Sequence, residues 1–222
     1  MRIGVIGAGR IGGNAARLLA TAGHEVMLSF SRDPDRLRAD AETIGERASV
    51  GEVADAARFG DVVIFSVPWR LIGDVLEHAG SLEGKVVIDT TNQYGSGGLE
   101  ELPDLTAAQV NQRRMPGALL VKAFNTLTSA FQASAAGREG DRRVVIFMAG
   151  DDDDAKATVA GLIEDAGFAP ADVGGLADAA VMEAPRREGA VYGEEYRQAD
   201  AAEVVEAVRA DRPIPPTPEY DD

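Results

Sequence analysis

The chain has 222 residues, enough for one large α/β domain with a sizeable core, or for a domain with a short extension. Its 22 basic and 37 acidic residues give a formal net charge of -15, which disfavours nucleic acid and anionic membrane surfaces as partners. The absence of cysteine excludes disulfides, thiolate metal sites and a cysteine nucleophile. The sequence shows no signal peptide and no long apolar run, so we expect a cytoplasmic protein with no membrane partner.

The first predicted element is a short buried strand, Arg2 to Ile6, which leads through Gly-Ala-Gly-Arg-Ile-Gly at 7–12 into a helix over 10–22. In this pattern the first glycine permits a tight turn, the second lets backbone N–H groups approach a pyrophosphate, and the third allows the helix to pack closely on the strand. The motif alone is weak, but its place between a strand and a helix is typical of dinucleotide binding. We expect the cofactor to contact Gly7, Gly9, Arg10, Ile11 and Gly12.

The next predicted strand, 25–30, ends in Ser31 and Arg32. An NAD site usually has a carboxylate here for the ribose 2′-hydroxyl, whereas arginine forms forked bonds to phosphate oxygens and favours NADP. Arg36, near the start of the following helix, offers a second positive contact. The alternative is that Ser31 and Arg32 are solvated loop residues and that Asp33 or Asp35 caps the helix.

Strand-like apolar runs then alternate with helical stretches, the pattern of a doubly wound, mostly parallel, Rossmann-like α/β sheet. The sequence predicts strands at 2–6, 25–30, 61–66, 85–89, 119–123, 144–149 and 169–173, with a short one at 49–51. It predicts helices at 10–22, 34–45, 53–59, 71–79, 105–113, 127–134, 152–166 and 199–210. We expect residues 1–175 to form the NADP-binding domain and residues 176–222 a small helical or irregular extension with a proline-rich tail.

Residues that follow parallel strands share one rim of the sheet, where ligands bind. Pro68 has no N–H, so a loop carbonyl beside it is free to face a nicotinamide ring. Trp69 either stacks on a planar ligand or closes the sheet edge over a helix, and asparagines offer uncharged hydrogen bonds or form turns. From this rim we expect cofactor contacts from Ser66, Val67, Pro68 and Asn92, and substrate contacts from Trp69, Asn92, Phe124 and Asn125.

Taken together, these motifs resemble the F420-dependent NADP oxidoreductases. The resemblance covers residues 1–178 and rests on Gly7 to Gly12, Gly23 to Val26 with Ser31-Arg32, Val67 to Trp69, Asp89 to Asn92, Lys122 to Thr126, and Ala149 to Asp152. It implies a Rossmann-like domain that binds NADP(H) through Gly7 to Gly12, Ser31 and Arg32. It further implies that coenzyme F420, a deazaflavin, lies over the nicotinamide near Val67, Pro68 and Asn92, in a cleft completed by a small C-terminal helical part.

The chain departs from the family pattern at residues 182–193, where the family has an apolar helical segment. Here Arg186, Arg187 and Tyr192 either bind an anionic hydride acceptor or form a surface loop. Hydride transfer between stacked rings depends on positioning rather than on acid–base groups, so we expect no catalytic side chain. Reduction of an imine or carbonyl would need a proton donor, for which Lys122, Tyr94 and Tyr192 are the candidates.

The four successive aspartates at 151–154 are expected to stabilise a helix start rather than to bind a metal, because they point in different directions. We expect a small-molecule hydride acceptor and a homodimer, since so small a domain leaves one side of the cleft open. Two alternatives to the F420 reaction remain at this point. One is an NADPH-dependent reductase of an imine, carbonyl or flavin-like acceptor, and the other is a non-catalytic NADP-binding sensor.

Replacing Arg32 by Ala tests the 2′-phosphate assignment. We expect the variant to lose affinity for NADPH much more than for NADH, because only NADPH carries the phosphate that the guanidinium would bind. Titration of the protein with each nucleotide measures the two affinities, and equal losses for both would contradict the assignment.

Overall fold

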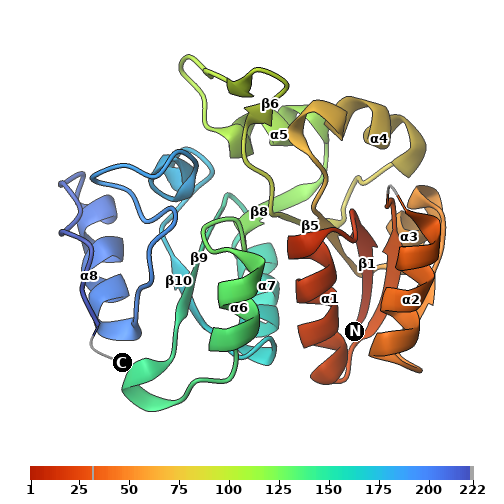
Figure 1. Ribbon diagram of the computed structural model, residues 1–222. Helices are drawn as coiled ribbons and strands as arrows, with labels where there is room; N and C mark the ends of the chain where they lie inside the picture. The colour runs from red at the N-terminus through yellow and green to blue at the C-terminus, as the bar shows by residue number, and fades with distance from the viewer. Residues whose placement is uncertain (32, 221–222) are drawn as a thin grey trace.

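The computed structural model describes residues 1–31 and 33–220. Its centre is an eight-stranded sheet with the strand order β10-β9-β8-β5-β4-β1-β2-β3 (Figure 1). The strands are β1 (Arg2–Ile6), β2 (Glu25–Ser29), β3 (Ala48–Val50), β4 (Val62–Phe65), β5 (Val86–Asp89), β8 (Leu119–Ala123), β9 (Val145–Gly150) and β10 (Ala169–Asp172).

The sheet is parallel from β3 to β8, and its direction reverses at β9. β9 pairs antiparallel with β8, with Lys122 opposite Ala149, and β10 then runs parallel to β9. The carboxyl ends of six strands therefore share one rim of the sheet. The carboxyl ends of β9 and β10 point toward the opposite rim. The sequence predicted the mostly parallel sheet and not the position of the reversal, because direction is set by how a connection crosses the sheet.

Helices cover both faces of the sheet and form two hydrophobic cores. Alternate residues of β4 serve the two cores: Val63 and Phe65 face one, and Val62 and Ile64 face the other, as the two-residue period of a strand requires. One core is covered by α1 (Arg10–Thr21), α2 (Pro34–Ile44), α6 (Ser129–Ala135) and α7 (Asp153–Asp165). The other is covered by α3 (Val53–Phe59), α4 (Ile72–Ala79), α5 (Ala107–Arg114) and α8 (Gln198–Arg209).

Every predicted strand and helix is present, and no end is displaced by more than two residues. The helix starts follow local chemistry: the Asp33 carboxylate accepts hydrogen bonds from the backbone N–H groups of Asp35 and Arg36, both at 3.1 Å. The sequence did not predict the small hairpin of β6 (Tyr94–Gly95) and β7 (Gly98–Leu99), which projects beside α5 in Figure 1. Its glycines are typical of a flexible loop, and only the pairing of the two short strands in the structure shows that the segment forms a hairpin.

The C-terminal segment packs on the outer strands, at the far edge from α2 and α3 (Figure 1). The backbone N–H of Val145 donates to the carbonyl of Tyr196 at 2.9 Å, and the Tyr196 ring meets Phe147 edge-on with 5.3 Å between centroids. Val204 of α8 is fully buried in the same core as Phe65 of β4. Residues 176–220 thus share a hydrophobic core with the eight-stranded sheet.

Among the described residues, no helix has both the length and the apolar character needed to cross a membrane.

Replacing Phe147 by Ala should lower the free energy of unfolding by about 3–5 kcal/mol, because it opens a cavity between β9 and the C-terminal segment. Leu99→Ala is the control, since the Leu99 side chain is 38% exposed and its loss should change stability little. Denaturant unfolding of both variants measures the difference, and equal stabilities would show that the C-terminal segment does not depend on this contact.

Candidate functional site

The glycine-rich turn between β1 and α1 is shaped by two close approaches. A Cβ atom at Gly12 would lie 2.2 Å from the carbonyl oxygen of Gly7, and one at Gly7 would lie 2.4 Å from the carbonyl oxygen of Ser66. Gly7 also has a φ of +102°, in the region that favours glycine. Gly7 and Gly12 are therefore required for packing of the turn against α1 and against the loop after β4.

Gly9 differs from these two, because a Cβ atom there would meet no described atom within 4 Å. Gly9 is the residue that precedes α1, and it has no side chain with which to cap the helix. The first turn, 10–13, contains no acidic residue, so no negative side chain of this turn compensates the positive end of the helix dipole. That end faces the open space in front of Gly9. This cradle fits the pyrophosphate of a dinucleotide.

A cleft of about 720 Å³ runs from this turn along the rim formed by the carboxyl ends of β1, β4, β5 and β8. It is the place at which a doubly wound sheet binds its ligand. The sequence-predicted residues that line it are Gly7, Gly9, Arg10, Ile11, Ser31, Arg36, Ser66, Val67, Pro68, Trp69, Asn92 and Asn125.

At one end of the cleft, Ser31 and Arg36 lie beyond β2. The Ser31 hydroxyl accepts a hydrogen bond from the backbone N–H of Asp33 at 3.2 Å. The Arg36 guanidinium is mostly exposed, and its Nε lies 3.7 Å from a carboxylate oxygen of Asp40. Asp33 caps α2, as the alternative interpretation of this loop expects, and it also lines the cleft. Arg32 lies outside the described residues.

In the middle of the cleft, the loops after β4 and β5 are joined by a hydrogen bond from the Thr90 hydroxyl to the Ser66 hydroxyl at 2.8 Å. Val67 and Pro68 follow Ser66 along the same wall. This wall therefore offers an apolar surface and a backbone stiffened by proline to a flat ring.

Asn92 and Asn125 face each other across the next two loops, and most of their hydrogen bonds are made within the protein. The Asn92 amide oxygen accepts from Asn125 Nδ2 and from the backbone N–H of Ala184, both at 3.2 Å, and its Nδ2 donates to the Asn125 carbonyl at 3.1 Å. Asn125 Nδ2 also donates to the Met182 carbonyl at 2.6 Å. The pair thus ties the rim to the C-terminal segment, while the buried Asn125 Oδ1 has no partner in the described part of the chain.

Two other predicted substrate residues are mainly buried. Trp69 is 3% exposed, donates from Nε1 to the Glu100 carboxylate at 2.6 Å, and has the Arg114 guanidinium 4.3 Å from its ring centroid. Trp69 therefore lines the cleft as a nearly buried side chain, and its stacking on a planar ligand stays a prediction. Phe124 is fully buried and is not part of the described cleft lining.

The C-terminal segment contributes Arg186, Tyr192 and Gly193 to the cleft, beside Tyr94 of the β6–β7 hairpin. The hydroxyl of Tyr94 donates to that of Tyr192 at 3.5 Å. Burial raises the pKa of the Tyr192 phenol well above its usual range. Tyr192 is therefore a neutral hydrogen-bond donor at any ordinary pH. The sequence identified these residues only as alternatives, since no local pattern brings positions 94 and 192 together.

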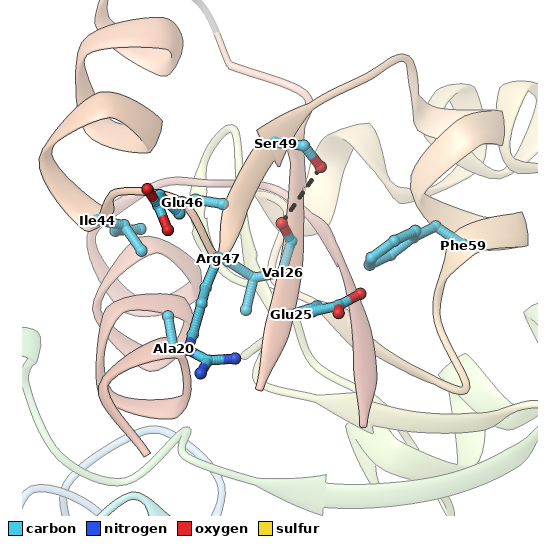
Figure 2. A pocket seen from close by; sticks show the side chains of 9 residues that line it. Ala20, Glu25, Val26, Ile44, Glu46, Arg47, Ser49 and Phe59 are labelled. Carbon is cyan, nitrogen blue, oxygen red and sulfur yellow. Dashed lines mark hydrogen bonds between the residues drawn. The ribbon is translucent and has the colours of Figure 1, made fainter. Parts of the chain in front are cut away.

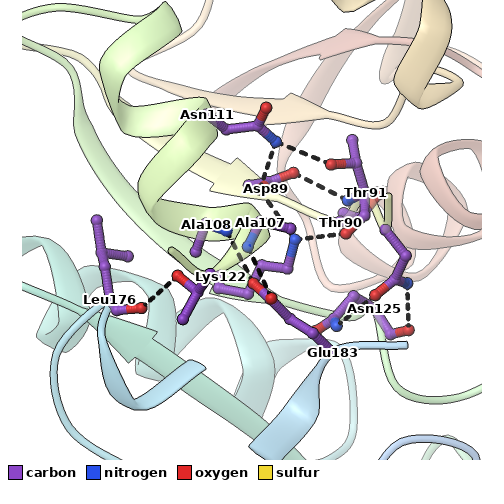
Figure 3. A network of polar contacts seen from close by, with 12 residues as sticks. Asp89, Thr90, Thr91, Ala107, Ala108, Asn111, Lys122, Asn125, Leu176 and Glu183 are labelled. Atoms are coloured by element: carbon purple, nitrogen blue, oxygen red, sulfur yellow. Dashed lines mark hydrogen bonds and ion pairs between the residues drawn. The ribbon is translucent and has the colours of Figure 1, made fainter. Parts of the chain in front are cut away.

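The remaining candidates from the sequence lie outside the cleft. Arg187 donates to the backbone carbonyls of Glu183 and Pro185 at 2.8 and 3.0 Å, and so braces its own loop. Lys122 is fully buried and pairs with Asp89 at 3.0 Å (Figure 3).

The aspartates at 151–154 are divided among structural tasks. Asp152 caps α7 by accepting from the Ala155 N–H at 2.8 Å, Asp151 accepts from the Leu176 N–H at 2.7 Å, and Asp153 pairs with Lys156 at 3.1 Å. Among the described residues, no group of three or more acidic or histidine side chains is arranged to hold a metal ion.

A second pocket of about 590 Å³ lies at the amino ends of β2 and β3 (Figure 2). The Arg47 guanidinium in this pocket donates to the Gly23 carbonyl at 3.0 Å, and the Ser49 hydroxyl donates to the Val26 carbonyl at 3.4 Å. The polar groups named here therefore help to hold β3, the outer strand of the sheet. The pocket lies at the amino ends of the strands, whereas the glycine-rich turn lies at their carboxyl ends.

Residues 2–93 match the model of a protein family described as NADP oxidoreductase coenzyme F420-dependent. A solved structure of a hypothetical protein from Sinorhizobium meliloti is 30% identical, with a TM-score of 0.78 over 89% of this chain and 95% of the other. A candidate F420-dependent NADP-reductase from Arthrobacter sp. FB24 is 28% identical, with a TM-score of 0.69 over 81% of this chain and 87% of the other.

Metalloreductase STEAP3 of Rattus norvegicus is 30% identical over 186 residues, which are 82% of this chain and 36% of that protein. The chain thus spans about a third of the length of the curated relatives it matches, 36% in each of two cases.

Gly9→Ala and Gly12→Ala should affect different properties, although both replace a glycine of one motif. Gly9→Ala should leave the thermal unfolding temperature nearly unchanged and weaken NADPH binding, because its methyl group enters the space in front of α1. Gly12→Ala should unfold at a distinctly lower temperature, because its methyl group overlaps the Gly7 carbonyl. Calorimetry and nucleotide titration measure the two effects, and tight NADPH binding by the Gly9 variant would refute the cradle.

Proposed function

The chain belongs to the family of F420-dependent NADP oxidoreductases, and on this premise we propose that it transfers hydride between NADPH and the deazaflavin coenzyme F420. The observation that carries the proposal is the single continuous cleft. One part of the cleft contains the uncapped start of α1 behind Gly9. Another part is lined by neutral side chains and tyrosines.

The cofactor half of the cleft suits NADP(H). Backbone N–H groups at 9–12 would bind the pyrophosphate, and the hydroxyl of Ser31 with the guanidinium of Arg36 would bind the 2′-phosphate, with Arg32 as a further contact proposed from the sequence. Val67 and Pro68 would support one face of the nicotinamide, and Thr90 and Asn92 would flank it.

The acceptor half suits a planar molecule with negative charge. Tyr94 and Tyr192 provide aromatic surface and neutral hydroxyl groups, while Arg186 brings a positive charge to the edge of the cleft. Arg186 is paired with Glu194, with Nη2 of the arginine 3.1 Å from the carboxylate, and this pairing fixes the direction of the guanidinium. In a chain with a net charge of -15, such a cation is a favourable anchor for an anionic acceptor.

When bound, NADPH supplies the hydride, and the oxidised deazaflavin takes up that hydride together with one proton from solvent. The protein's own residues then have to bind and orient the two rings and exclude water from them. Catalysis therefore depends on positioning rather than on acid–base groups. Tyr192 cannot act as a base, because burial keeps its phenol protonated.

Stopped-flow absorbance of the purified protein with NADPH and oxidised F420 tests the proposal. We expect rapid loss of the deazaflavin absorbance with NADPH, little with NADH, and little with FMN as acceptor. Tight NADPH binding with F420 left oxidised would refute F420 as the acceptor, and imine and carbonyl acceptors would then be assayed in its place.

A matched pair of arginine variants locates the acceptor. Arg186→Ala should raise the KM for F420 and leave NADPH affinity unchanged, whereas Arg142→Ala removes the same charge from an exposed position away from the cleft and should change neither. Equal effects of the two substitutions would show that only the overall charge matters.

A further inference from the structure

A buried polar network lies directly beneath the rim of the cleft (Figure 3). Its centre is the ion pair of Asp89, at the end of β5, and Lys122, in β8, with 3.0 Å between Nζ and the carboxylate and both side chains fully buried. Asn111 of α5 is also fully buried and donates to the Asp89 carboxylate at 2.9 Å. Three elements that are far apart in the sequence therefore converge at one point.

The network holds Thr91 by each of its polar groups. Its backbone N–H donates to the Asp89 carboxylate at 2.9 Å, its hydroxyl accepts from Asn111 Nδ2 at 2.9 Å, and its carbonyl accepts from Lys122 Nζ. The peptide groups on either side of Thr91 are thus fixed from below, and the segment has little freedom to rotate.

Thr91 lies between two other residues of the cleft wall, Thr90 and Asn92. The Thr90 hydroxyl is bonded to Ser66, and the Asn92 amide oxygen accepts from the backbone of Ala184 in the C-terminal segment. A shift of Thr91 would therefore move the wall at the proposed nicotinamide and the contact to the acceptor side together.

Lys122 does not reach the cleft itself. Its ammonium is fully buried, is not part of the described lining, and points toward Asp89 and the Thr91 carbonyl. Stability alone does not account for the ion pair, because apolar side chains of similar volume often serve a buried position as well as two charges do. What an apolar pair would lack is a donor for the Thr91 carbonyl.

We propose that Lys122 is a positioning residue, which sets the path of Thr90 to Asn92 and through it the alignment of the two reacting rings. The inference rests on the proposed hydride transfer and names the part of the protein that controls its geometry. Small displacements of a reacting ring slow transfer greatly, even when binding is retained.

The test uses Asp89→Asn/Lys122→Met, because Lys122→Met alone would leave a buried carboxylate unpaired. In the double variant the new amide oxygen can still accept from the Thr91 N–H, but the Thr91 carbonyl loses its charged donor and Asn111 Nδ2 loses its acceptor at position 89. Lys156→Met is the matched control, since Lys156 is also ion-paired, to Asp172 at 3.0 Å, but lies outside the cleft.

We expect the double variant to bind NADPH with nearly wild-type affinity and to transfer hydride in a single turnover about tenfold to a hundredfold more slowly. Lys156→Met should transfer at the wild-type rate, even if its unfolding temperature falls. A double variant that transfers hydride at the wild-type rate would overturn the proposal, whatever its stability.

Amide hydrogen exchange over residues 90–92 provides a readout that needs no acceptor. Exchange should be faster in the double variant and unchanged in Lys156→Met, and equal exchange in both would overturn the positioning role. If the wild-type protein fails to reduce F420, the proposed function falls, and the exchange measurement still decides whether Lys122 fixes this segment.

Discussion

The close approach of α1 to the sheet is the constraint on which the site depends. Gly12 lies against the Gly7 carbonyl and Gly7 against the Ser66 carbonyl, so the helix start and the loop after β4 form one packed unit. Within this unit the uncapped end of α1 meets open space at Gly9 rather than another side chain. The same contact places Ser66, and with it Thr90, beside the glycine-rich turn, so the turn and the middle of the cleft belong to one packed unit.

The reversal of the sheet at β9 explains why the C-terminal segment can complete the cleft. Because β9 runs against β8, the chain leaves the outer strands in a position to pack back over them, where Phe147 and Tyr196 meet. The segment before α8 then returns to the rim, and Ala184 bonds Asn92 while Tyr192 reaches Tyr94. A segment that packs in the same hydrophobic core as the sheet thus also lines the cleft.

The polar groups beneath and across the rim differ in role. Some fix the conformation of the backbone, and others remain available to bind a ligand. Asp89, Lys122 and Asn111 are buried and satisfied, and they fix a loop rather than touch a ligand. Asn92 uses its amide within the protein, which makes it part of that order. Such networks define one conformation of a backbone segment better than an apolar core does, because each donor and acceptor has a direction. This is the property that hydride transfer between two stacked rings requires of its surroundings.

The sequence alone determined the strands, the helices, the glycine cradle and the rim, because these follow from local periodicity and from the sterics of adjacent residues such as Gly7 and Gly12. It also contained Lys122, Tyr94 and Tyr192 as candidate proton donors, and Tyr192 as a candidate contact to an anionic acceptor. The tertiary structure decided the surroundings of these side chains. It buries Lys122 against Asp89 and pairs Tyr192 with Tyr94, which is 98 positions away in the sequence. It also buries Phe124, which does not line the described cleft. Burial and long-range pairing depend on how the sheet turns at β9 and how the C-terminal segment packs, and no short stretch of sequence specifies either.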